Sequence, residues 1–230
     1  MDAPKIAMLL YPGCTPLDLL APHAAFSHAA EVHLVWKDLD PVPTDSGVSL
    51  LPTTTLADCP ADLAVLFVPG GLGQAPIAED LDVLEFLADR GARARYVTSV
   101  CGGSLLLGAA GLLRGHRATS HWTGLELLEA FGAERVDERV VVDRNRITGG
   151  GVTAGLDFGL VVLAELLGEE TARLTQLALE YDPAPPFGAG TPEASGPVLT
   201  GRAREFAKPV NDAMAVAAER LAGQGWGRAR

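Results

Sequence analysis

The chain has 230 residues, of which 48% are hydrophobic and 20% charged, and its formal net charge is −11. This composition excludes a disordered chain, and the acidic balance disfavours nucleic acid or an anionic membrane surface as a partner. The three cysteines have no C-x-x-C spacing and predict neither a disulfide framework nor a zinc site, which is typical of a reducing compartment. No apolar run is long enough to span a bilayer, so we expect a cytoplasmic protein.

The first strand and helix bring an acidic side chain to the edge of the predicted sheet. Residues 5–11 form a nearly continuous apolar run, which is typical of a strand buried on both faces. Thr15 is a candidate cap for a helix that starts at Pro16 and continues to Ser27. Asp18 therefore lies in the first helical turn, where the helix dipole would stabilise the negative charge of its side chain. Ligands also bind at this edge of parallel sheets, so a functional role is equally open.

The next segments add strands and a glycine-rich loop. Strands are expected at residues 31–36 and 63–68, with a peripheral hairpin over residues 42–56 between them. The loop over residues 69–73 lacks the lysine of a phosphate-binding loop, so it is a weak nucleotide motif. Gly71 either brings a backbone N–H close to a small ligand or forms a simple tight turn. A single amphipathic helix is expected from Ile77 to Arg90.

A cysteine stands where a buried strand changes abruptly into a helix. Residues 96–100 are typical of a buried parallel strand, and Leu105 begins a run suited to a helix, so Cys101 and Gly102 must form a sharp turn. A helix N-terminus favours thiolate over thiol, and this placement predicts a nucleophile with a lowered pKa. The alternative is a buried cysteine that acts only as a small hydrophobic residue.

A histidine follows twenty positions after this cysteine. His121 starts a helix expected over residues 124–131, where it could polarise the thiol, orient a water, or only cap the helix. Residues 136–143 and 146–148 predict a hairpin. The glycines at 149–151 then either pack closely against the helix that follows Cys101 or form an anion site.

The C-terminal third is expected to be helical, with one long loop. Helices are predicted over residues 155–167, 169–181 and 203–221. The proline- and glycine-rich segment 182–197 is a candidate lid or dimer-wrapping arm. The alternation of strands and helices predicts a single α/β domain over residues 1–230, with a doubly wound, mostly parallel sheet between helices on both faces. Residues 183–230 form a loop and helix extension of that domain.

In this order, the features resemble the ThiJ/PfpI superfamily, which has the class I glutamine amidotransferase-like fold. The segments that carry the likeness are Asp18 after the first strand, the turn at 68–71, the elbow at 100–103 and residues 119–122. Within the superfamily, residues 11–18, 114–122 and 143–155 are most similar to isocyanide hydratases. Those enzymes usually have threonine directly after the nucleophile, whereas this chain has Gly102. The absence of a histidine at that position argues against the PfpI-type peptidases.

The resemblance implies an enzyme with a small-molecule substrate, no metal or organic cofactor, and a homodimeric assembly. The implied reaction converts an isocyanide to an N-substituted formamide. In it, the Cys101 thiolate attacks the terminal carbon to give a thioimidate, and Asp18 transfers protons and assists water. Backbone N–H groups of Gly71 and Gly102 bind the developing charge, and His121 belongs to a second layer of the site.

Two other functions fit the same residues. One is a cofactor-free glyoxalase or deglycase acting on small dicarbonyls, which a His121 ring within hydrogen-bond reach of the sulfur would favour. The other is a non-catalytic domain that senses a ligand, or senses oxidants through oxidation of Cys101.

Overall fold

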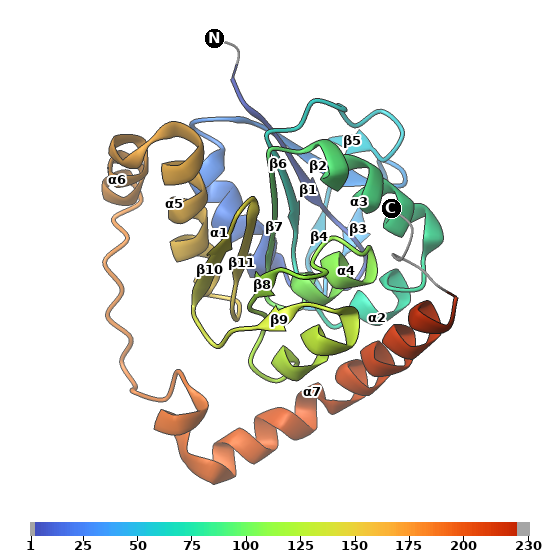
Figure 1. Ribbon diagram of the computed structural model, residues 1–230. Coiled ribbons are helices and arrows are strands. Elements are labelled where there is room, and N and C mark those ends of the chain that lie inside the picture. Colours follow the sequence, from blue (N-terminus) through green and yellow to red (C-terminus); the bar gives the residue numbers. More distant parts are fainter. Residues whose placement is uncertain (1–2, 225–230) are drawn as a thin grey trace.

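The computed structural model describes residues 3–224. A sheet of seven strands lies at the centre of the molecule (Figure 1). Their order across the sheet is β10-β11-β7-β6-β1-β2-β5, and every neighbouring pair is parallel except β10 and β11. The strands are β1 (Lys5–Leu9), β2 (Glu31–Trp36), β5 (Thr54–Thr55), β6 (Val65–Val68), β7 (Tyr96–Val100), β10 (Val140–Asp143) and β11 (Arg146–Gly149). This topology confirms the predicted fold class.

Helices cover both faces of this sheet. On one face α1 packs against α5, and α6 packs on α5; on the other, α3 and α4 lie against β6 and β7 (Figure 1). These helices are α1 (Pro16–Phe26), α3 (Leu81–Arg93), α4 (Gly103–Ala109), α5 (Ala154–Leu167) and α6 (Glu169–Ala178). Beyond α4 lie α2 (Gln74–Ile77), the 3-10 helix η1 (Leu125–Phe131) and α7 (Pro192–Gly223).

Two pairs of short strands stand apart from the central sheet. The antiparallel pair is β3 (Val42–Pro43) with β4 (Ser49–Leu50), and the parallel pair is β8 (Arg117–Ala118) with β9 (Glu134–Arg135). The first pair is the hairpin expected within residues 42–56. None of the helices within residues 3–224 is long and apolar enough to cross a membrane.

The middle of the sheet is a dry, closely packed core. The side chains of β6 are fully buried, and Phe67 packs against Phe158 of α5 with ring centroids 5.5 Å apart. Phe26 of α1 contacts the same ring edge-on at 6.5 Å. Burial of three aromatic side chains stabilises this layer strongly. The carboxyl ends of β1, β6 and β7 are consequently held at fixed positions.

Several predicted helices have different limits. The helix expected over residues 77–90 is divided into α2 and α3, because the Asp80 side chain accepts a hydrogen bond from the Val83 N–H and starts a new helix there. Thr15 precedes α1 but does not cap it with its side chain, because its hydroxyl donates to Asp45 at 2.6 Å. Residues 125–131 form a 3-10 helix that ends at Gly132, whose φ is 82°.

The C-terminal helix also differs from the prediction. It begins at Pro192 rather than at residue 203, because the Thr191 hydroxyl caps its first turn, and it kinks at Gly196, where φ is 72°. The segment between α6 and α7 runs along the outside of the molecule (Figure 1). Residues 225–230 of the expected extension lie outside the described residues.

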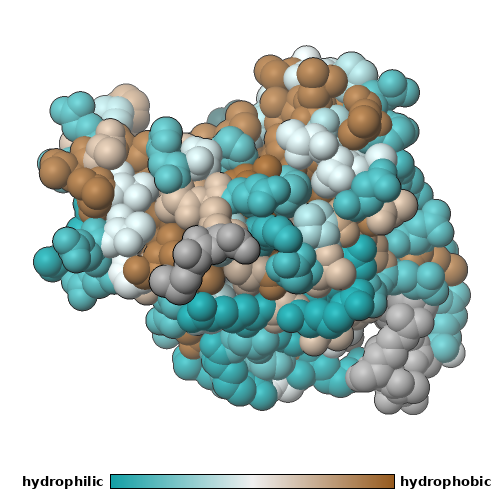
Figure 2. All heavy atoms as spheres, turned by 90° about the horizontal axis from the view of Figure 1, so that it is seen from above, coloured by the Kyte–Doolittle hydropathy of each residue, from teal (hydrophilic) through white to brown (hydrophobic). Residues whose placement is uncertain are grey.

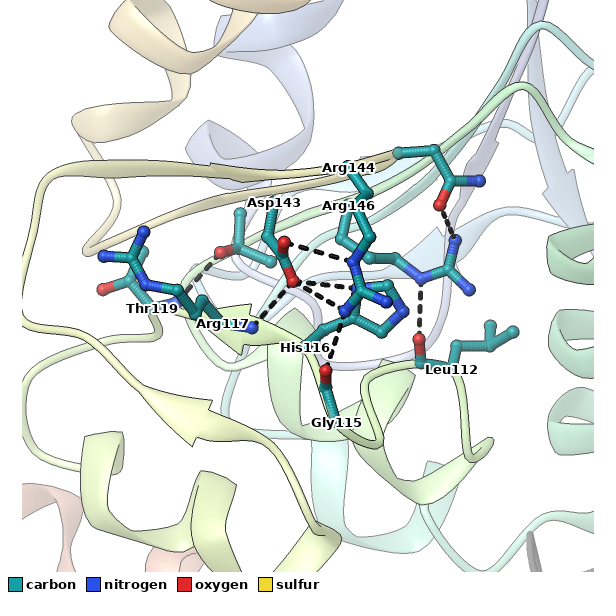
Figure 3. Close-up of polar contacts among 10 residues, drawn as sticks. Leu112, Gly115, His116, Arg117, Thr119, Asp143, Arg144 and Arg146 are labelled. Carbon is teal, nitrogen blue, oxygen red and sulfur yellow. Dashed lines mark hydrogen bonds and ion pairs between the residues drawn. The ribbon is translucent and has the colours of Figure 1, made fainter.

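A cluster of charged groups holds the β10–β11 hairpin to the segment that follows α4 (Figure 3). Asp143 accepts a hydrogen bond from the Arg117 N–H at 3.0 Å, and pairs with His116 and Arg144. The Arg146 side chain donates to the carbonyl of Leu112 at 2.7 Å. Because β11 lies beside β7, this cluster also fixes the backbone next to Cys101.

Candidate active site

Cys101 occupies the sharp turn that the sequence predicts between β7 and α4. Its φ is 59°, a left-handed conformation that a residue with a side chain rarely adopts. Its N–H donates to the carbonyls of Gly149 and Gly150, at 3.0 and 2.7 Å, and its own carbonyl accepts from the Ser120 hydroxyl at 2.9 Å. These backbone contacts therefore fix the position of Cys101 in the turn, where the residue is 8% exposed.

The glycines at 149–151, at the end of β11, have a different role from the one predicted. Gly149 lies against Val100 and Phe158, and Gly151 lies against His121. The expected packing of these glycines against α4 is wrong, because it is their carbonyl groups, through the bonds to Cys101, that support the turn.

Asp18 and Cys101 are brought together across a glycine. Asp18 is fully buried, and its Oδ2 accepts a hydrogen bond from the Gly70 N–H at 3.0 Å. A Cβ atom on Gly70 would lie 2.9 Å from both Asp18 Oδ2 and Cys101 Cβ, so only glycine leaves room for the two side chains to meet. The Asp18 carboxyl and the Cys101 thiol therefore lie close enough that each shifts the pKa of the other. Oδ1 of Asp18 has no hydrogen-bond partner within residues 3–224.

The electrostatics of this pair differ from those expected for a helix N-terminus. Burial raises the pKa of Asp18 from 3.8 to about 7, although hydrogen bonds from Cys101 and Gly70 oppose the shift. Burial and the charge of Asp18 raise the pKa of the Cys101 thiol well above its usual value, and the Gly102 N–H only partly offsets this. The expectation of a lowered thiol pKa is therefore wrong. Above pH 7 the two side chains share one proton.

A pocket of about 520 Å³ opens over the thiol. Among the residues predicted for the site, Cys101, Gly102, Gly71 and His121 line this pocket. Asp18 does not line it and reaches it only through its contact with Cys101. The structure thus gathers the five predicted residues around one cavity.

His121 makes contacts typical of a structural residue. Its Nδ1 lies 2.8 Å from the Thr123 hydroxyl and accepts a weaker hydrogen bond from the Thr123 N–H at 3.3 Å. It makes no hydrogen bond to the Cys101 sulfur in the part of the chain that the structure describes. Burial lowers the pKa of His121, so the ring is neutral at pH 7. Its ring forms part of the pocket wall beside Trp122, with ring centroids 5.8 Å apart.

Sequence analysis missed the part of the pocket wall that comes from α7. Phe206 and Val210 lie on the apolar face of this helix; Phe206 is 71% exposed, and both line the pocket. No residue of the candidate lid 182–197 contributes to the lining. One indication of this contact was present in the sequence: the apolar face of α7 extends towards its N-terminus, beyond the buried Met214, to Val210 and Phe206.

Two polar lining residues were also missed. Asp45, in the loop between β3 and β4, is held by the Thr15 hydroxyl, and Gln74 starts α2. Neither follows a recognisable catalytic motif. Within residues 3–224, no group of three or more His, Cys, Asp or Glu side chains is arranged to hold a metal ion.

Comparison with known proteins gives consistent matches. The DJ-1/PfpI family model matches residues 4–165. An isonitrile hydratase from Pseudomonas putida is 51% identical over 89% of this chain and 90% of its own length. The crystal structure of a ThiJ/PfpI family protein from Pseudomonas syringae has a TM-score of 0.92 and 50% identity, over 95% of this chain and 91% of that one. A glutathione-independent glyoxalase from Caenorhabditis elegans is 26% identical over 57% of this chain and 70% of its own length.

Proposed function

The chain belongs to the DJ-1/PfpI family, as its resemblance predicted, and from this premise we propose that it hydrates isocyanides to N-substituted formamides. The observation that carries the proposal is the contact between the Asp18 carboxyl and the Cys101 thiol, below a pocket, in a chain 51% identical to an isonitrile hydratase. A nucleophile and a proton donor in contact are what this reaction requires.

The first step adds the thiol across the terminal carbon of the isocyanide, R–N≡C. Asp18 as carboxylate takes the proton from the Cys101 sulfur, and the sulfur forms a bond to the carbon. The same proton then passes from Asp18 to that carbon and gives the thioimidate R–N=CH–S. Since the carbon receives both the sulfur and the proton, the two groups must be on the same side of the substrate. The shared buried position of Asp18 and Cys101 supports this arrangement.

The second step hydrolyses the thioimidate. Asp18 takes a proton from a water molecule whose oxygen attacks the carbon and passes this proton to the nitrogen, which gives the adduct R–NH–CH(OH)–S. The carbon–sulfur bond then breaks as the hydroxyl proton passes, by way of Asp18, to the sulfur, and the formamide R–NH–CHO leaves. The net reaction consumes one water molecule, and Cys101 and Asp18 return to their starting state.

Backbone N–H groups near the sulfur suit the charge that develops during both steps. The Gly102 N–H acts to lower the pKa of the Cys101 thiol, so it can stabilise negative charge on the sulfur as the thiolate forms and departs. Gly71 lies on the pocket wall, and its N–H donates to no group within residues 3–224. His121 is neutral and is held by Thr123. Its proposed role is therefore to form part of the pocket wall, and not to transfer a proton.

The pocket favours a neutral substrate with an apolar substituent. Its walls are mainly apolar, with Leu105, Trp122 and Phe206 among them, and no lysine or arginine within the described residues lines it. The one formally charged lining group, Asp45, disfavours a carboxylate on the substrate. Alkyl and aryl isocyanides are accordingly the proposed substrates.

A homodimer and a cytoplasmic location are further parts of this proposal. Figure 2, a view from the end of the sheet at which the parallel strands begin, shows apolar side chains in several separate groups, and α6 carries apolar side chains among its charged ones. Leu174 and Leu177 of that helix are strongly exposed, which suits contact with a second copy. All three cysteines are free, as expected in a reducing compartment.

Formation of formamide tests the proposal directly. Wild-type protein is incubated with an aryl isocyanide and with an alkyl isocyanide, and the formamide is quantified by NMR. Cys101→Ser is expected to reduce the rate below detection, whereas Cys59→Ser, which alters a buried thiol that does not line the pocket, keeps it. Equal rates for wild type and Cys101→Ser would refute the proposal. Lactate from methylglyoxal with no formamide would replace it with the glyoxalase alternative.

A further inference from the structure

Gln74 presents an unpartnered carboxamide to the pocket beside the proposed nucleophile. The residue is only 4% exposed and lines the pocket. Its side chain makes no hydrogen bond to any group within residues 3–224. The amide faces the open pocket, where a bound molecule can supply hydrogen bonds to it in place of water.

The carboxamide occupies the space that a side chain at position 102 would take. A Cβ atom on Gly102 would lie 1.8 Å from Gln74 Oε1 and 2.9 Å from Nε2. The φ of Gly102 is −65°, which any residue can adopt. Glycine at 102 therefore leaves room for the Gln74 amide in this position, and the backbone conformation does not require it. Gly102 directly follows Cys101 in the chain, so the amide lies next to the residue to which the substrate becomes bonded.

The backbone that carries Gln74 is rigid. The loop before α2 is tied down by the Tyr11 hydroxyl, which donates to the Pro69 carbonyl at 3.1 Å, and by the Gly73 N–H, which donates to the Gly13 carbonyl at 2.9 Å. A Cβ atom on Gly73 would come within 2.1 Å of a backbone oxygen. The position of Gln74 is thus fixed against the same residues that precede α1.

We propose that the Gln74 carboxamide hydrogen-bonds the nitrogen of the group attached to Cys101 and promotes hydrolysis of that covalent intermediate. This inference rests on the proposed hydration reaction. In the thioimidate R–N=CH–S, the nitrogen carries a lone pair that accepts an N–H from the amide. Polarisation of the C=N bond then makes the carbon a better target for water. After the nitrogen is protonated, the amide oxygen can accept its N–H, so one side chain serves both states.

The departure at position 102 is explained by this arrangement. The resemblance to isocyanide hydratases predicts a threonine hydroxyl next to the nucleophile, and here Gly102 leaves that space to the amide of Gln74. The polar group beside the sulfur is retained, but it comes from α2 instead of from the turn itself.

The lifetime of the covalent intermediate tests this role. Gln74→Met keeps the length of the side chain and removes the amide, and Gly102→Ala displaces the amide while Gln74 stays in the chain. Each is expected to slow hydrolysis by about 10- to 100-fold, so that intact-mass spectra taken during turnover show a Cys101 adduct absent from wild type. The double variant is expected to be no slower than the single ones, because both remove one interaction. Gln176→Met, on exposed α6, is the matched control.

A second substrate separates this inference from the proposed function. p-Nitrophenyl acetate acetylates an active cysteine, and the thioester oxygen can accept the same amide N–H. A longer-lived acetyl adduct in Gln74→Met supports the inference, even if wild type produces no formamide and the hydration proposal fails. Equal adduct lifetimes in wild type and Gln74→Met, with either reagent, would overturn it. Lower stability of Gly102→Ala does not affect this outcome, because Gln74→Met is measured independently.

Discussion

Replacement of Asp18 by asparagine should change how the stability of the protein depends on pH. The folded pKa of about 7, against 3.8 for a free carboxyl, means that the folded state holds a proton that the unfolded state releases. Stability gained from this proton is fully present below pH 3.8 and is lost as the pH rises through 7. At about 1.4 kcal/mol per pKa unit, the shift corresponds to roughly 4 kcal/mol in total, of which about 2.5 kcal/mol is lost between pH 5 and pH 8.

The asparagine side chain keeps an oxygen for the Gly70 N–H but cannot ionise, so Asp18→Asn should show a flat stability over the same range. The measurement is urea unfolding of wild type and variant at pH 5, 6, 7 and 8, with free energies extrapolated to zero denaturant. Asp143→Asn is the control, because the Arg144 side chain and other contacts lower the pKa of Asp143 to about 2. That variant should lose stability equally at all four pH values. The same slope for wild type and Asp18→Asn would show that Asp18 ionises as a free carboxyl does and refute the reasoning.

Three further predictions concern activity and packing. The rate of formamide formation should rise about tenfold from pH 6 to pH 8, because Asp18 must be ionised to take the thiol proton; a flat pH–rate profile would contradict this. Gly103→Ala should cost about 1 to 3 kcal/mol in urea unfolding, because its Cβ would lie 2.1 Å from the Val68 carbonyl, whereas Gly201→Ala, with open space around it, should not destabilise. Phe206→Ala should raise KM for aryl isocyanides several-fold and change KM for methyl isocyanide little, and an equal change for both would exclude Phe206 from the substrate contact.

Local sequence patterns were sufficient for the turn and for the general position of its partner. A β-branched run stops at Cys101, and a pattern of small residues typical of a helix follows it. Together they define a strand, a turn and a helix within fifteen residues. The rule that carboxyl ends of parallel strands meet at one edge then places Asp18 on the same side as Cys101. Both inferences depend on neighbours along the chain or on a general property of parallel sheets.

The remaining parts of the site depend on contacts between distant segments. Phe206 lies about one hundred residues after Cys101, and its exposure depends on the start of α7 at Pro192, which the threonine cap and the kink at Gly196 determine. Gln74 reaches the site only because α2 is separate from α3, and the predicted single helix concealed that break. Neither position could be read from hydrophobic periodicity, because periodicity does not report which pocket a helix face meets.

The protonation state of the pair shows how burial changes the chemistry that a turn alone suggests. A thiolate at the start of a helix has the charge to attack an electrophile, but addition to R–N≡C also requires a proton at the same carbon. In the proposed mechanism, the proton that leaves the sulfur stays within the pair instead of passing to solvent, because burial raises the pKa of both Cys101 and Asp18. The raised thiol pKa is therefore compatible with nucleophilic attack, provided that Asp18 accepts the proton as the carbon–sulfur bond forms. This requirement couples the two residues so closely that Asp18→Asn should impair formation of the Cys101 adduct as well as its hydrolysis.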